Sequence, residues 1–180
     1  MEALDHYIAM ARYNAWMNRR IYDVCGVLDD EQRKRDLGAF FRSIHGTLNH
    51  LLLADRTWMA RFTGDADRFA SYNADGTRIA FKSLADELYA DFATLRRERE
   101  QTDADIITWV RESLTASQLD ETLRYRTSKG AALEHPTWWA LSHFFNHQTH
   151  HRGQVTTLLM QLGRDPGVTD LLVLMLRPDG

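Results

Sequence analysis

Histidine is the residue type in this chain best suited to chemistry. The 180 residues include eight histidines but only one cysteine and three prolines, and five of the histidines lie in the short stretch from His135 to His151. Neutral imidazole nitrogens are the commonest metal ligands in proteins. The cluster therefore predicts a site for one divalent ion, provided that the local structure brings the nitrogens together.

The helix predicted around this cluster carries the stretch LSHFFNHQTHHRGQVTTLL. A helix turns about 100° per residue, so four histidines fall within one arc of roughly 100°; they are His143, His147, His150 and His151. Two histidines at positions i and i+4 can bind one ion, as in the helix of zinc proteases. His143 with His147 and His147 with His151 both have this spacing, so spacing alone leaves the choice open.

The apolar side of the same helix separates the four histidines. Its predicted core positions are Phe144, Val155, Leu158, Leu159 and Leu162. His151 projects into this apolar arc and His147 lies at its edge, whereas His143 and His150 point further outward. Buried imidazoles without partners would cost on the order of 1–3 kcal/mol each. A metal ion would satisfy His147 and His151 together.

A third ligand is expected from another helix, because three protein ligands and an open position are usual for reactive zinc. His45 and His50 lie on opposite flanks of the apolar stripe of the helix predicted around them, and the helical wheel permits either. Asp55 falls inside that stripe, where a carboxylate needs a partner. It could orient a histidine, act as a base or pair with an arginine such as Arg152.

Four long amphipathic segments predict an all-α fold, an antiparallel four-helix bundle in a single domain spanning residues 1–180. The helices are expected from Leu4 to about Val27, from Ala39 to Phe62, from Ser83 to about Ser113 and from Pro136 to Leu162. A long loop over 64–82 precedes the third helix. A small hairpin is predicted before the fourth, with strands flanking Ser128, Lys129 and Gly130, and a short helix from about Thr169 ends the fold.

Composition excludes several classes of function. A net charge of -3 and a pI near 6.2 argue against nucleic-acid binding. Cys25 has no disulfide partner in the chain and the start is acidic, so we expect a cytoplasmic protein. The longest C-terminal apolar run, Leu171 to Leu176, is far shorter than the roughly 20 residues of a membrane span.

The five tryptophans are interpreted as core and rim of the bundle rather than as a cage for an organic cofactor. They are Trp16, Trp58, Trp109, Trp138 and Trp139. We therefore expect a metal ion and no organic cofactor.

Three blocks of sequence resemble a known family over nearly the whole chain. They are ARYNAWMNRRIY, LNHLLLADRTWMARF and HFFNHQTHHRGQ, the last running into LGRDPGVTDLLVLM. The chain resembles the DinB-like proteins, also called the YfiT-like or damage-inducible group. The resemblance implies a four-helix bundle that forms a homodimer and holds one nickel or zinc ion. Carried over onto this sequence, it implies His50, His147 and His151 as the metal ligands.

The resemblance also directs the expected function. The better understood relatives are thiol transferases or isomerases that use bacillithiol, mycothiol or glutathione, and others are classed as hydrolases. We expect a thiol S-transferase whose partners are a small-molecule thiol and an electrophilic substrate. A metal-dependent hydrolase and a non-catalytic, metal-binding dimer are the alternatives. No catalytic residue beyond the metal ligands is predicted.

Overall fold

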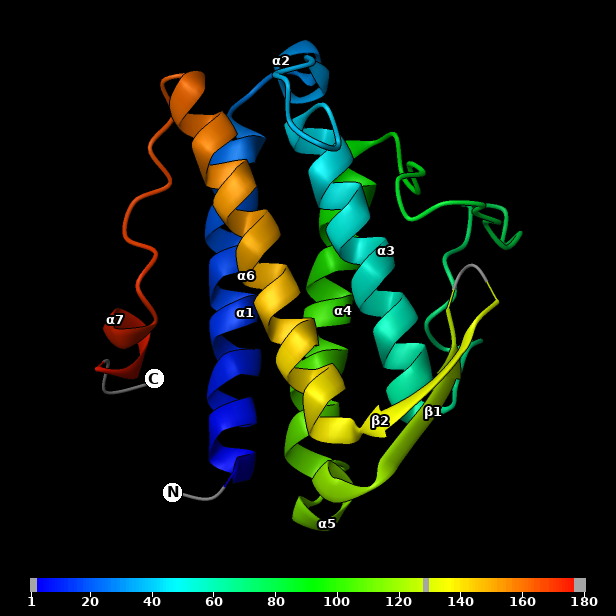
Figure 1. Ribbon diagram of the computed structural model, residues 1–180. Coiled ribbons are helices and arrows are strands. Elements are labelled where there is room, and N and C mark those ends of the chain that lie inside the picture. Colours follow the sequence, from blue (N-terminus) through cyan, green and yellow to red (C-terminus); the bar gives the residue numbers. More distant parts are fainter. Residues whose placement is uncertain (1–2, 128–129, 177–180) are drawn as a thin grey trace.

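The computed structural model describes residues 3–127 and 130–176. Within these residues the chain forms seven helices and one two-stranded antiparallel sheet (Figure 1). The long helices are α1 (Ala3–Gly26), α3 (Ile44–Thr63), α4 (Phe92–Glu112) and α6 (Thr137–Gln161). The short elements are α2 (Asp30–Lys34), α5 (Ala116–Asp120), α7 (Leu171–Met175), β1 (Thr122–Arg126) and β2 (Ala132–Pro136). The fold is thus mostly helical as predicted, and the sheet is the one departure from an all-α chain.

The long helices lie side by side, with α1 and α6 running in one direction and α3 and α4 in the other (Figure 1). Each of α1 and α3 packs against both α4 and α6. Phe62 stacks on Trp109, and both lie near the C-terminal ends of their helices, α3 and α4. This contact is consistent with parallel neighbours. The expectation of antiparallel neighbours throughout is therefore wrong for two pairs, α1 with α6 and α3 with α4.

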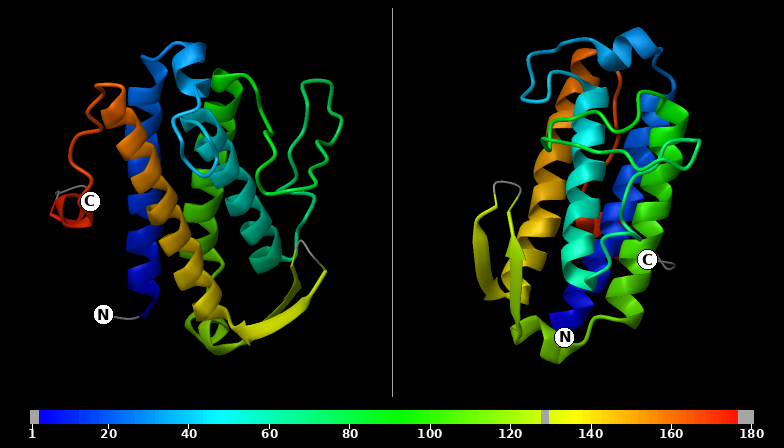
Figure 2. Two further views of the ribbon diagram at one scale, coloured as in Figure 1. Left: turned by 45° about the horizontal axis from the view of Figure 1, so that its top comes forward. Right: turned by 90° about the vertical axis from the view of Figure 1, so that its right-hand side faces the viewer.

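The long connection 64–91 accounts for this topology, because it carries the chain back along α3 before α4 begins. Figure 2 shows it crossing the outer face of α3. The predicted helix start at Ser83 is wrong: α4 begins at Phe92, where the Asp91 side chain accepts a hydrogen bond from the Thr94 backbone N–H at 2.7 Å. A side chain of α3 also takes the N–H groups of the preceding turn, since Asn49 Oδ1 accepts from the backbone of Leu88 and Tyr89, each at 2.9 Å.

A tight turn over 39–43 precedes α3, which begins at Ile44 rather than at Ala39. Ser43 caps the helix by accepting from the Gly46 backbone N–H at 3.0 Å. Arg42 has a φ of 66°, a left-handed conformation that is strained for a side-chain-bearing residue. The Phe41 carbonyl oxygen would lie 2.4 Å from a Cβ at position 46, so the turn can approach the helix only because that residue is glycine.

The predicted hairpin is confirmed. Thr122 pairs with Pro136 and Tyr125 with Leu133 in the antiparallel ladder. Ser128 and Lys129, predicted to form its turn, lie outside the described residues. The hairpin leads directly into α6, so it stands beside the end of the bundle at which α6 begins (Figure 1).

The interior is divided into three layers along the bundle. Two clusters of buried apolar residues fill the ends, one around Ile21, Leu52 and Val155 and the other around Ile106 and Phe144. Between them lies a buried polar layer contributed by all four long helices, with Asn14, Asn18, Asp55, Arg99, Asp103 and Arg152 as members. Among the described residues, no helix is both long enough and apolar enough to cross a membrane.

The tryptophans divide between the core margin and the surface. Trp16, Trp58 and Trp109 pack against the apolar clusters, whereas Trp138 and Trp139 are 45% and 54% exposed. This matches the interpretation of the tryptophans as core and rim.

Candidate metal centre

Three histidines from two neighbouring helices meet between α3 and α6. His50 Nε2 of α3 lies 3.1 Å from His147 Nε2 and 3.2 Å from His151 Nε2 of α6. The three atoms lie within 4.8 Å of one another. We call His50, His147 and His151 the histidine triad. His147 and His151 lie one turn apart on the same face of α6, so both can face the single residue His50 of α3.

The spacing of the triad nitrogens suits a metal ion. Bonds of roughly 2.0–2.1 Å at tetrahedral angles place two ligand nitrogens about 3.3 Å apart. The distances from His50 Nε2 to the other two nitrogens, 3.1 and 3.2 Å, are close to this value. The triad could therefore hold a metal ion, and three imidazoles are a donor set suited to zinc, nickel and related ions.

Hydrogen bonds at the outer nitrogens turn two of the rings inward. His50 Nδ1 lies 2.8 Å from the Leu84 carbonyl oxygen, and His151 Nδ1 lies 2.7 Å from Oε1 of Gln154. Both oxygens only accept hydrogen bonds, so each Nδ1 carries the proton and donates it. Each Nε2 is then left with a lone pair directed at the centre of the triad, which is the arrangement found at metal-ligating histidines.

The surroundings keep the triad neutral. Burial, together with the smaller effect of the neighbouring histidines, lowers the pKa of His147 to about 3. Burial also lowers the pKa of His50 to about 4, against the opposing effect of the hydrogen bond to Leu84. The pKa of His151 is lowered for the same reason, with Gln154 opposing the shift. Unprotonated imidazole is the form that binds metal ions.

Phe41 covers one side of the triad. Its ring stacks on that of His50 with centroids 3.8 Å apart, and it meets His151 edge to face at 5.5 Å. The turn over 39–43 holds Phe41 there, and Gly46 permits that turn to sit on α3. An apolar cover strengthens polar interactions beneath it by excluding water.

Comparisons with known proteins agree with this fold. A family model described as the DinB family matches residues 2–177. The chain belongs to the DinB family. It is 25% identical over 178 residues to Protein DinB of Bacillus subtilis (strain 168), with 92% of this chain and 91% of that protein covered.

A crystal structure of a DinB-like protein from Bacillus cereus ATCC 10987 shares the fold of this DinB-family chain. The two structures match with a TM-score of 0.58 at 19% sequence identity, and the match covers 85% of this chain and 91% of the other. At that identity the likeness concerns the fold alone.

The other histidines weighed from the sequence lie outside this centre of the DinB-family chain. His45, the alternative to His50, is fully buried, and its Nε2 lies 2.9 Å from the Tyr89 carbonyl oxygen. His143 and His150 are exposed on α6. His45 thus anchors the 64–91 connection to α3, while His50 alone of the two faces α6.

Asp55 pairs with an arginine, although not with the one named from the sequence. Its Oδ2 accepts from Arg99 Nη1 at 2.6 Å, and Arg99 also pairs with Asp103 at 2.8 Å. Arg152 instead donates to Asn14 and Thr149. We call Asp55, Arg99 and Asp103 the ion network; all three side chains are at least nine-tenths buried.

Three contributors to the centre were missed from the sequence: Phe41, Gln154 and the Leu84 carbonyl. Gln154 stands three residues after His151, at helical spacing, so its contact was open to prediction. Leu84 contributes only a backbone oxygen and Phe41 lies in an irregular turn. Neither leaves a signal in residue type or spacing.

Proposed function

We propose that this DinB-family chain is a metal-dependent enzyme, and specifically a thiol S-transferase that uses a low-molecular-weight thiol at the histidine triad. One observation carries the proposal: three Nε2 atoms converge, and oxygen acceptors hold the outer nitrogens of His50 and His151. Nickel or zinc fits this donor set. When bound, the ion supplies a positive charge that favours the thiolate form of a thiol at neutral pH.

The chain itself offers no competing thiol nucleophile. Its one cysteine, Cys25, is fully buried, and burial raises its pKa to about 12. A thiolate at this position would be neither formed near neutral pH nor accessible to an electrophile. The nucleophile of a transferase built on this chain therefore has to arrive as a small molecule.

Hydrolysis is the second candidate, and the position of Asp55 disfavours it. Activation of water usually needs a general base in addition to the ion. Asp55, the acidic residue considered for that role, is 1% exposed and is bound to Arg99. A non-catalytic metal-binding dimer is the third candidate, and the Phe41 ring over the triad favours it.

We further propose that the protein lies in the cytoplasm and acts on two small-molecule partners. The partners are a small thiol and an electrophilic substrate, and the free Cys25 suits the reducing cytoplasm. We also propose a homodimer. Exposed apolar side chains on and near α7 support a second copy as partner, with Leu172 65% and Leu176 76% exposed.

The test combines metal analysis with an activity screen. The purified protein is loaded with nickel or zinc, its metal content is measured, and glutathione and bacillithiol are each assayed with an electrophilic reporter. His151→Ala is expected to lose the metal and the activity together. His150→Ala is the matched control, because it removes the adjacent, exposed histidine, and it should retain both.

Two results would overturn parts of this proposal. Full metal content in His151→Ala would show that the ligand assignment is wrong. Cleavage of esters or amides by the metal-loaded protein, without turnover of any thiol, would replace the transferase with the hydrolase. A loaded protein inactive in both assays would leave the non-catalytic dimer.

A further inference from the structure

A cavity of about 370 Å³ lies on the outer side of α3, beneath the 64–91 connection and the end of the hairpin. Its apolar lining includes Leu53, Ala60, Phe69, Ile79, Phe81 and Leu84. Four arginines also line it: Arg56, Arg61, Arg78 and Arg126. Among the described residues, no aspartate or glutamate lines this cavity, which we call the arginine cavity.

Two of the four arginines are neutralised within the protein. Arg56 Nη2 lies 2.7 Å from a carboxylate oxygen of Glu98, and Arg78 Nη1 lies 3.0 Å from one of Asp67. In the described part of the chain, Arg61 and Arg126 have no carboxylate within 4.0 Å. The arginine cavity therefore carries two positive charges that lack a counterion.

Arg61 is held in place by its neighbours. Its guanidinium lies 4.6 Å from the ring centre of Trp58 and 4.5 Å from that of Tyr125, and Nη2 donates to the Arg126 carbonyl oxygen at 3.3 Å. Burial lowers the pKa of Arg61, which is the sign of a partly desolvated cation. A fixed cation of this kind binds an oxyanion with little loss of side-chain freedom.

We propose that the arginine cavity binds a small organic carboxylate with an apolar body. The carboxylate group lies at Arg61 and Arg126, and the apolar body packs against Phe69 and Ile79. The cavity falls within the range of roughly 300–1,000 Å³ that is usual for small-molecule sites. An apolar lining with a few convergent polar groups is also the usual composition of such a site.

This binding site adjoins the histidine triad without depending on it. Leu84 lines the cavity, and its carbonyl oxygen accepts the hydrogen bond from His50 Nδ1. The inference requires no metal and no thiol chemistry. It can therefore fail or hold independently of the proposed function.

The test measures binding to the metal-free, full-length chain by titration calorimetry. The probe is 4-phenylbutyrate, and 4-phenylbutanamide is its uncharged analogue of matching shape. We expect the carboxylate to bind at least ten-fold more tightly than the amide. Arg61→Gln should weaken carboxylate binding about ten-fold and leave amide binding nearly unchanged.

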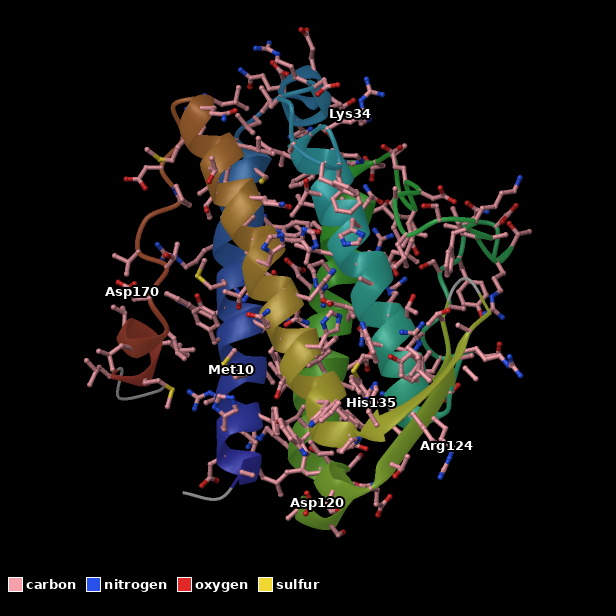
Figure 3. The ribbon with its side chains drawn as sticks, viewed as in Figure 1. Met10, Lys34, Asp120, Arg124, His135 and Asp170 are labelled. Carbon is pink, nitrogen blue, oxygen red and sulfur yellow. The ribbon has the colours of Figure 1, made fainter. Side chains whose placement is uncertain are left out.

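The hairpin offers a matched pair of variants. Arg126→Gln should weaken carboxylate binding several-fold. Arg124→Gln removes the same charge from the same strand and should have no effect, because Arg124 lies outside the lining and pairs with Glu134 at 3.1 Å. Figure 3 shows Arg124 extending from β1 away from the helices.

Three results would overturn the inference. They are equal affinity for the acid and the amide, equal losses in Arg124→Gln and Arg126→Gln, and no carboxylate binding at millimolar concentration. Arg126 is exposed, so its variant is expected to fold even if the Arg61 variant does not. Melting curves of both variants identify any loss that comes from unfolding.

Discussion

The histidine triad and the ion network are both largely buried polar clusters to which α3 contributes, but their polar groups are paired in different ways. In the ion network, Arg99 lies between two carboxylates, and Asn14 and Asn18 donate to Asp103. In the triad, hydrogen bonds occupy the outer nitrogens of His50 and His151, while Nε2 of His147 and Nε2 of His151 lie 3.1 and 3.2 Å from His50 Nε2.

This difference distinguishes a buried cluster that stabilises the fold from one that is suited to bind a ligand. In the ion network opposite charges meet inside the protein, because Arg99 lies between two carboxylates and the positive charge of Arg152 is nearby. In the triad, by contrast, nitrogens of like kind meet with no opposite charge among them, so that cluster could hold a metal ion. Both clusters are polar and largely buried, and the pairing of their groups distinguishes them.

Breaking the ion network should give the largest loss of stability. Arg99→Met leaves Asp55 and Asp103 buried without their cation, which is expected to lower the free energy of unfolding by about 3–5 kcal/mol. Urea unfolding of the metal-free protein measures the change. The control is Arg97→Met on the exposed side of the same helix, expected to stay within about 0.5 kcal/mol. Equal losses in both variants would contradict a structural role for the network.

Binding of a metal ion at the triad should give the next largest change in stability. An ion at 100 times its dissociation constant stabilises the folded state by about 2.7 kcal/mol, which raises the melting temperature by roughly 5–10 °C in a chain of this size. His147→Ala should abolish the shift, whereas His143→Ala, one turn earlier on α6, should keep it. Thermal melts with added zinc or nickel and with a chelator make the measurement. A shift that survives in His147→Ala would place the ion elsewhere.

The change in stability of the metal-free protein with pH should be somewhat smaller than the change on metal binding. The pKa of His50 is about 4 in the folded state, against about 6.5 in an unfolded chain, so the unfolded state takes up a proton first as the pH falls. Stability should therefore be retained above pH 6.5 and decline toward pH 4. The difference in pKa alone corresponds to roughly 3 kcal/mol, and solvent screening of the partly accessible ring reduces the expected decline to on the order of 2 kcal/mol. Urea unfolding across this range tests the sign. His50→Gln should reduce the decline without abolishing it, because the pKa of His147 and of His151 is lowered as well, and an equal reduction by His6→Gln would contradict this assignment.

Substitutions at two helical glycines should give the smallest changes in stability, and the two changes should have opposite signs. A Cβ at Gly46 would lie 2.4 Å from the Phe41 carbonyl oxygen, whereas one at Gly153 would meet nothing within 4 Å. Gly46→Ala should destabilise the protein by about 1 kcal/mol and weaken metal binding by displacing Phe41. Gly153→Ala should stabilise it by about 0.5–1 kcal/mol. Denaturant midpoints compare the two, and changes of the same sign would show that Phe41 is not held as described.

Local pattern predicted most of the helices, and the failures have a common cause. The helix expected from Ser83 begins only at Phe92. The backbone N–H groups of Leu88 and Tyr89 donate hydrogen bonds to the side chain of Asn49, which is distant in sequence. Arg152 was one of the partners considered for Asp55, and Arg99 of α4 takes that place. Each failure involves a contact between segments whose packing no local periodicity encodes.

The sequence by itself determined that His147 and His151 lie one turn apart on an amphipathic helix, because helical periodicity is a local property of the chain. Residue spacing left His45 and His50 equal, and family resemblance favoured His50. Only the tertiary structure decided which nitrogens meet, because the 64–91 connection and the antiparallel packing of α3 on α6 turn His50 toward α6 and His45 toward Tyr89. The direction of a side chain depends on the neighbour against which its helix packs.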